Sequence, residues 1–146
     1  MYKRFFYLSL SVLWMILIYS MSAKTASSSS DDSMFITEYI IRFFFSDPSA
    51  ELLDFAETII RKIAHFTEYA VLSILLTLTL KSFGLTLKKS LFAVAISFFY
   101  AISDEVHQCF VPGRACRIFD VFIDTLGAFG GYLICVLSAK IFKRKN

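Results

Sequence analysis

The 146-residue sequence has few residues of the kinds that build metal or catalytic sites. It contains only two histidines, His65 and His107, and they show no recognised zinc spacing. It also lacks a nucleophile elbow, a Walker loop and any other catalytic signature, and no nucleic-acid-binding pattern combines its basic and aromatic residues. We therefore expect no metal, no cofactor and no nucleic-acid partner, and the sequence leaves enzymatic activity uncertain.

Long apolar runs dominate what is present, since 57% of the residues are hydrophobic. Runs approaching twenty residues match the length needed to cross a hydrocarbon core of about 30 Å. We predict an all-α fold: a small polytopic membrane helical bundle, with residues 1–146 as one domain. About four transmembrane helices are expected, at 5–21, 63–80, 91–109 and 118–142. The first run also resembles a secretory signal, whose removal would leave three spans and place the chain ends on opposite sides.

The basic residues predict the orientation of this bundle. In a four-span arrangement one side carries many of them and no acidic residue: Lys3, Arg4, Lys81, Lys88, Lys89, Lys140, Lys143, Arg144 and Lys145. By the positive-inside rule that side is cytoplasmic, so both termini are expected in the cytoplasm. The net charge of +3 is thus a topology signal.

The opposite side holds a long loop over residues 22–62 and a short one over 110–117. Residues 24–32 are rich in Ser and Asp and are expected to be flexible. Helical spacing then predicts an extracytoplasmic amphipathic helix that Pro48 ends, with its apolar side formed by Phe35, Ile36, Tyr39, Ile40, Phe43 and Phe44. This helix could lie flat at the membrane interface or pack on the spans as a lid. A further helix is expected to start near Ser49 and continue into the second span.

Polar side chains gather at the outer ends of the last three predicted spans. A carboxylate at the bilayer centre costs at least ~2.5 kcal/mol, so such residues are functional candidates by default. We predict that they line one outward-facing ligand-binding pocket, built from Arg61, His65, Glu68, Tyr69, Asp104, Glu105, Gln108, Arg114, Asp120 and Asp124. In the structural alternative, three arginines only form buried pairs that hold the helices together: Arg61, Arg114 and Arg117 with Glu68, Glu105 and Asp120.

Two roles can be named within this set. Val111-Pro112-Gly113-Arg114 is a turn signal, so Arg114 either caps Glu105 or Asp120 or holds a phosphate or carboxylate of a ligand. Glu105 and His65 are the candidate acid and base if the protein is catalytic.

Small residues on the last span and the cysteines each have two interpretations. Gly127 and Gly131 form a G-x-x-x-G pattern, which lets a helix approach closely, either within the bundle or from a second copy in a homo-oligomer. Cys109 and Cys116 flank the short outer loop and could form a disulfide, but we favour free thiols that act as small apolar residues. Cys135 has no partner.

Two sequence blocks resemble the signature of the VanZ-like family. The first is Ile60–Tyr69, IRKIAHFTEY; the second runs from Ser103–Gln108, SDEVHQ, through Val111–Arg114 to Asp120 and Asp124–Ala128. Ser20 and Ser22 also resemble serines that close the first span in this family. One departure is Cys116-Arg117, where small polar residues are usual.

The resemblance implies a small integral protein of the bacterial cytoplasmic membrane. The founding member of the family is associated with low-level resistance to the glycopeptide teicoplanin, so a contribution to such resistance is a further expectation. We expect membrane lipids as partners, together with a lipid-linked envelope precursor or a lipoglycopeptide bound in the pocket. The alternative is a membrane enzyme that acts by acid/base chemistry on a lipid-linked envelope substrate. A transporter is a weaker option, because four short spans leave little room for alternating access.

Overall fold

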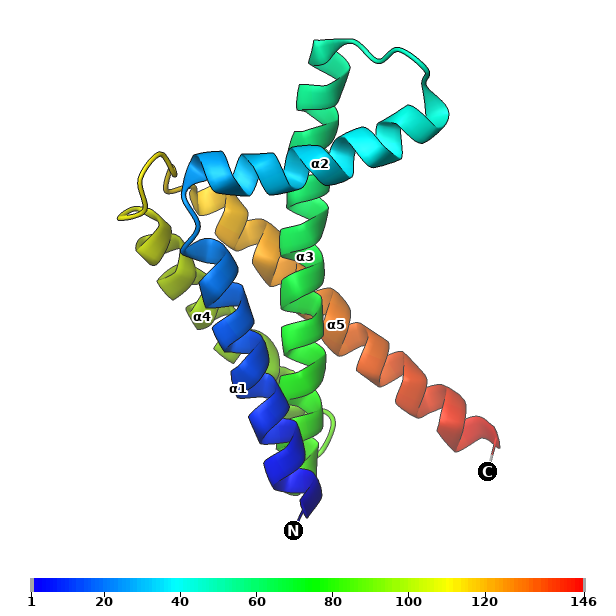
Figure 1. Ribbon diagram of the computed structural model, residues 1–146. Helices are drawn as coiled ribbons and strands as arrows, with labels where there is room; N and C mark the ends of the chain where they lie inside the picture. Colours follow the sequence, from blue (N-terminus) through cyan, green and yellow to red (C-terminus); the bar gives the residue numbers. More distant parts are fainter. Residues whose placement is uncertain (1, 146) are drawn as a thin grey trace.

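The computed structural model describes residues 2–145, and side chains up to residue 141. The described residues contain no strand, which confirms the all-α prediction (Figure 1). The elements, in chain order, are α1 (Tyr2–Ser22), α2 (Ala26–Phe44), α3 (Ala50–Ser82), the short 3₁₀ helix η1 (Lys89–Leu91), α4 (Phe92–Gln108) and α5 (Ile118–Lys145).

Three of these helices are long and apolar enough to cross a membrane, namely α1, α3 and α5 over Ile118–Ile141. Helix α4, which covers the third predicted span (91–109), is not among them, and its 17 residues are at the short end of the transmembrane range. Helix α3 has 33 residues and starts at the predicted place, where Ser49 caps it. It continues without a break into the second predicted span. These features confirm a small helical membrane bundle.

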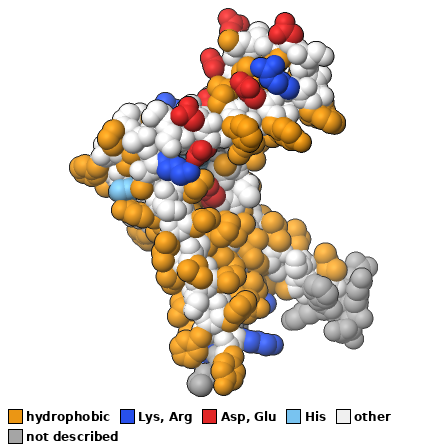
Figure 2. All heavy atoms as spheres, in the orientation of Figure 1, with side chains coloured by type: hydrophobic (Ala, Val, Ile, Leu, Met, Phe, Trp, Pro, Cys, Tyr) orange, Lys and Arg blue, Asp and Glu red, His pale blue; other side chains and the backbone are white. Residues whose placement is uncertain are grey.

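The helices form a bundle whose two ends differ (Figure 1). Both chain termini lie at one end, and α2 crosses α3 near the other, which we call the outer end. Helix α5 crosses α3 and then diverges from it toward its own C-terminus. On the face drawn in Figure 2, the Asp and Glu side chains gather around α2 and the start of α3, whereas hydrophobic side chains cover the middle of the bundle.

The interior is built from small residues as much as from large apolar ones. Ser11, Ser73, Thr77, Ser90 and Ser97 are almost completely buried, and many large apolar side chains are exposed on the outside of the helices. In lipid, small residues let helices approach closely and large apolar residues face the acyl chains. This inside-out distribution is therefore typical of a membrane bundle.

The glycine pair of α5 serves a contact within the chain. A Cβ atom built on Gly127 would lie 2.1 Å from the carbonyl oxygen of Phe66, and one on Gly131 would lie 2.1 Å from that of Ala70. Both glycines thus let the backbone of α5 press against α3. The groove considered for a second copy is filled by α3 of the same chain.

The expectation of a flexible segment over residues 24–32 is wrong. Helix α2 begins at Ala26, and the Thr25 side chain caps it by accepting a hydrogen bond from the backbone N–H of Ser28. Ser30 and Ser33 then donate hydrogen bonds of 2.8 and 2.6 Å to Oε1 of Glu57 on α3. The serines are ordered because of this distant acceptor, which local composition cannot reveal.

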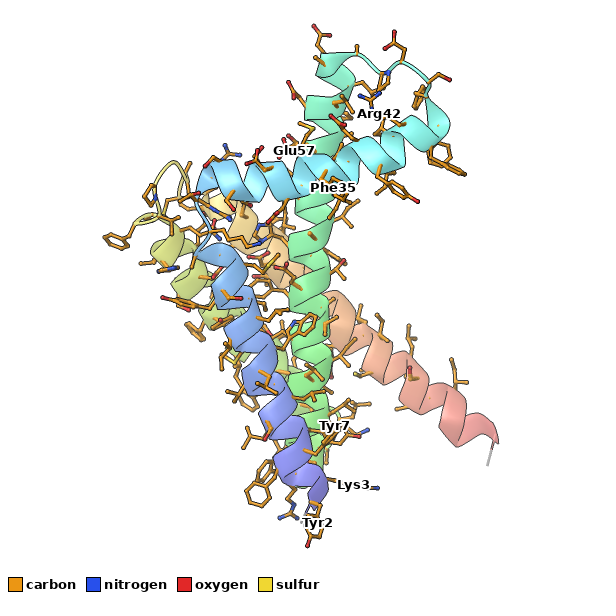
Figure 3. The ribbon with its side chains drawn as sticks, in the orientation of Figure 1. Tyr2, Lys3, Tyr7, Phe35, Arg42 and Glu57 are labelled. Carbon is orange, nitrogen blue, oxygen red and sulfur yellow. A yellow bond between two sulfur atoms is a disulfide. The ribbon has the colours of Figure 1, made fainter. Side chains whose placement is uncertain are left out.

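The lid interpretation of α2 is also wrong. Its aromatic residues do not pack on the spans, since Phe35, Tyr39 and Phe43 are 77%, 80% and 83% exposed. Figure 3 shows Phe35 on the side of α2 toward the bundle and Arg42 on the opposite side. The apolar side of α2 thus points toward the spans but remains exposed. This is the arrangement expected of an amphipathic helix that lies at the membrane interface.

Cys109 and Cys116 form a disulfide, so the preference for free thiols is wrong. Gly113 between them adopts a positive φ of +77°, which glycine tolerates and which reverses the chain. The reversal brings the end of α4 close to the start of α5, with the two cysteine Cα atoms 4.9 Å apart. Cys135 is a free, partly buried cysteine.

Candidate functional site

The Arg114 guanidinium joins three segments at the outer end. Its Nε and Nη2 donate hydrogen bonds to the carbonyl oxygens of Lys24 (3.0 Å) and Met21 (3.2 Å), just past α1 and at its end. Its Nη1 donates to Oε1 of Gln108 (3.3 Å), and Gln108 Nε2 donates in turn to Oδ2 of Asp104 (3.0 Å). Burial of this loop residue lowers the pKa of the guanidinium, although arginine remains charged in proteins.

The ion pairs at the outer end are not those expected in the structural alternative, in which three arginines neutralise the carboxylates. Arg61 pairs with Glu57 at 3.6 Å and Lys62 with Asp120 at 3.7 Å, and His65 Nδ1 lies 3.6 Å from Oδ1 of Asp124. Among the side chains that the structure describes, no ion pair within 4.0 Å involves Arg114, Arg117, Glu68, Asp104 or Glu105. Arg114 therefore does not cap Glu105 or Asp120, and the pairing scheme proposed from the sequence is wrong.

Glu105 holds the start of α5. It is buried, and its Oε1 accepts a short hydrogen bond from the backbone N–H of Arg117, immediately before the helix. A carboxylate at this position also interacts favourably with the positive end of the helix dipole. Two cavities at the outer end are lined by His65, and Glu105 lines neither of them, so the geometry does not support the pairing of Glu105 with His65 as acid and base.

A first hollow, the amphipathic cavity, lies between the end of α1, α2 and α3, with a volume of about 140 Å³. Its apolar walls come from Ile18, Met21, Ile36, Ile60 and Ala64. Its polar lining consists of Ser22, Lys24, Ser29, Asp32, Ser33, Arg61, His65, Glu68, Asp104 and Arg114.

A second hollow, the cationic cavity, has a volume of about 260 Å³ and lies between α3, the start of α2 and the loop that precedes α5. Four cationic side chains line it, against two carboxylates, Glu57 and Asp120. The cations are Arg61, Lys62, Arg114 and Arg117. The two cavities share Arg61, His65 and Arg114, so they are neighbouring parts of one pocket.

The structure brings most of the predicted site residues into this pocket. Seven of the ten line one or both cavities: Arg61, His65, Glu68, Asp104, Gln108, Arg114 and Asp120. Glu105, Tyr69 and Asp124 do not; Tyr69 and Asp124 are almost completely buried, Asp124 next to His65.

Sequence reasoning missed the contribution of the residues between α1 and the middle of α2. Lys24, Ser29, Asp32 and Ser33 line the amphipathic cavity, as does Ser22, which the family resemblance had noted. One available signal was the four-residue spacing of Ser29, Ser33 and Thr37, which marks a polar helical stripe.

Two buried oxygen atoms of the pocket have no hydrogen-bond partner among the described residues. They are Ser22 Oγ and Asp104 Oδ1, and both side chains line the amphipathic cavity. A buried polar atom left unsatisfied costs about 1–3 kcal/mol. Such atoms are therefore expected to meet a polar group that enters the cavity.

The amino-acid sequence matches the model of the VanZ/LLP1 family over residues 6–141, nearly the whole chain. The chain belongs to the VanZ/LLP1 family. The match confirms the resemblance carried by the two sequence blocks, and with the apolar helices it defines a VanZ/LLP1 membrane protein. The comparisons with curated proteins and with solved structures found no match.

Proposed function

We propose that this VanZ/LLP1 protein binds the anionic headgroup of a lipid-linked cell-envelope ligand in an outward-facing pocket. The observation that carries the proposal is the excess of cations over carboxylates in the cationic cavity. Guanidinium groups present fixed donors that match the oxygens of phosphate and carboxylate groups. Arg117 has no carboxylate within 4.0 Å among the described side chains, so its charge is free for such a ligand.

The position of the pocket supports a ligand that arrives from the membrane surface. It lies at the outer end, beside α2, whose exposed aromatic residues suit the membrane interface. In the orientation expected from the basic residues, this end faces away from the cytoplasm and both termini lie inside. A headgroup could therefore enter the cationic cavity while its lipid chains remain in the outer leaflet.

Binding of a lipid-linked envelope component would account for low-level protection against teicoplanin. Teicoplanin carries a lipid chain and meets its target at the membrane surface. A protein that binds the same lipid-linked molecules, or binds the drug itself, would lower the access of the drug to its target. The enzymatic alternative receives no support from the pocket geometry, because Glu105 lines neither cavity.

The direct test measures binding of dihexanoyl phosphatidylmethanol, a short-chain lipid with one phosphate charge, to protein purified in detergent. We expect saturable binding that weakens at least tenfold in Arg117→Gln, because a charge that contacts phosphate is removed. Arg42→Gln is the matched control, since Arg42 lies on α2 outside both cavities and pairs with Glu38. Absence of saturable binding by the wild-type protein would overturn the proposal.

The role in resistance is tested separately in a sensitive Gram-positive host. Wild type, Arg117→Gln and Arg42→Gln are expressed at matched membrane levels, and susceptibility to teicoplanin and vancomycin is compared. We expect selective protection against teicoplanin from the wild type and the Arg42 variant only. Equal susceptibility in all strains would separate the binding function from resistance.

A further inference from the structure

The amphipathic cavity contains two carboxylates that have no close ion pair among the described side chains. Glu68 and Asp104 line it, and neither has an ion pair within 4.0 Å among the described side chains. Three cationic side chains also line it: Lys24 pairs with Asp32 at 2.6 Å and Arg61 with Glu57 at 3.6 Å. Arg114 donates its hydrogen bonds to two carbonyl oxygens and to Gln108, so none of the three bonds Glu68 or Asp104 directly.

The unsatisfied oxygens point to the same conclusion independently. Asp104 is 4% exposed; one of its carboxylate oxygens accepts from Gln108, and Oδ1 has no partner. Ser22 is 5% exposed, and its Oγ also has no partner. Asp104 Oδ1 can only accept, so the group that satisfies it must donate, whereas Ser22 Oγ can accept or donate. Beside Glu68 and Asp104 a positively charged donor is favoured.

The shape and lining of the cavity select the kind of cation. A primary ammonium offers three donors on one small centre, and the apolar walls suit the methylene groups that carry it. About 140 Å³ accommodates a short aminoalkyl arm but not a lipid chain. A metal ion fits poorly, since among the described residues no group of three or more His, Cys, Asp or Glu is arranged to hold one.

We propose that the amphipathic cavity binds a primary ammonium group carried by the same molecule whose phosphate occupies the cationic cavity. The shared residues Arg61, His65 and Arg114 show that the two cavities are adjacent, as the short linker of an aminoalkyl phosphate requires. The ligand class is therefore a zwitterionic aminoalkyl phosphate lipid, of which ethanolamine phospholipids are the simplest example. This inference rests on the proposed function, which assigns the phosphate.

The first test compares three short-chain probes on wild-type protein in detergent. Dihexanoyl phosphatidylethanolamine carries the ammonium, its N-acetyl derivative has lost that charge, and phosphatidylmethanol has no arm. We expect phosphatidylethanolamine to bind at least tenfold more tightly than either of the others. Because no residue is changed, this comparison does not depend on the folding of a variant.

The second test changes the cavity instead of the probe. Asp104→Asn retains an oxygen acceptor for Gln108 and removes the charge, and Glu68→Gln removes the other charge. Each is expected to weaken phosphatidylethanolamine binding about tenfold more than it weakens phosphatidylmethanol binding. Glu38→Gln makes the same charge change on the exposed side of α2 and is expected to alter neither.

The outcomes separate the two proposals. If all three probes bind equally and Arg117→Gln weakens all of them, the ammonium site is overturned and the proposed function stands. If no probe binds, the proposed function fails and the ammonium site fails with it. A tenfold preference for phosphatidylethanolamine that survives in both Asp104→Asn and Glu68→Gln would place the ammonium elsewhere and overturn the assignment to this cavity.

Discussion

The two ends of the bundle join their helices by different means. At the outer end, charged and amide side chains reach across segments: Arg114 links the end of α1 to α4, and Lys62 pairs with Asp120 between α3 and α5. At the opposite end, the buried links are hydroxyl contacts such as Ser11 Oγ to Thr79 Oγ1 at 3.0 Å and apolar packing, and the charged link, from Arg4 Nε to the Ser82 carbonyl oxygen at 2.8 Å, is exposed. The charged links of the outer end are therefore partly buried, whereas the charged link of the opposite end is exposed.

This difference separates stability from function. At the opposite end the buried contacts between α1 and α3 come from small hydroxyl and apolar residues, which let helices pack closely in lipid, and the charged Arg4 stays exposed. Buried charges are a poor source of stability, because their desolvation offsets most of their attraction. The charges of the outer end are therefore better explained by the pocket that they line than by a need to join the helices.

The largest expected loss of stability comes from a change where α5 crosses α3, between the two ends of the bundle. Gly131→Val places a side chain where even a Cβ would lie 2.1 Å from the Ala70 carbonyl oxygen, so α5 must separate from α3. We expect a loss of about 3 kcal/mol in unfolding free energy, from thermal unfolding in detergent. Gly130→Ala is the control, since its Cβ would meet only the end of the Phe66 ring at 3.3 Å. A Gly131→Val protein of normal stability would contradict the α3–α5 contact.

An intermediate effect is expected for Arg114→Lys at the outer end. A lysine cannot reproduce the three separate hydrogen bonds of the guanidinium, so the end of α1 loses its link to α4. The unfolding free energy should fall by about 2 kcal/mol. Arg42→Lys, in an exposed pair with Glu38, is expected to change it by less than about 0.5 kcal/mol. Equal stability of both variants would mean that Arg114 is not a structural link.

The smallest effect is expected at the opposite end. Ser11→Ala removes the hydrogen bond to Thr79, and such bonds between membrane helices are worth about 0.6 kcal/mol on average. Ser20→Ala, whose hydroxyl bonds only within α1, serves as the reference for the loss of a serine. A loss in Ser11→Ala as large as that of Arg114→Lys would remove the contrast between the two ends.

Local patterns in the sequence were sufficient for the helices and for most of the pocket. Apolar runs of membrane-spanning length predicted the spans, and the four-residue spacing of Arg61 and His65 placed both side chains on one side of α3. The turn Val111–Arg114 placed Arg114 at the outer end. These features depend on residues close together in the chain, which is why they could be predicted.

What the sequence alone determined is therefore the all-helical membrane bundle and the gathering of polar residues at one end. The tertiary structure decided the partners: Glu57 orders the serines of α2, Arg114 binds carbonyl oxygens instead of carboxylates, and α3 fills the glycine groove of α5. Each of these contacts joins residues far apart in the sequence, and several candidates of similar chemistry compete for each. Only the packing of the helices brings one candidate within bonding distance and leaves the others unpaired.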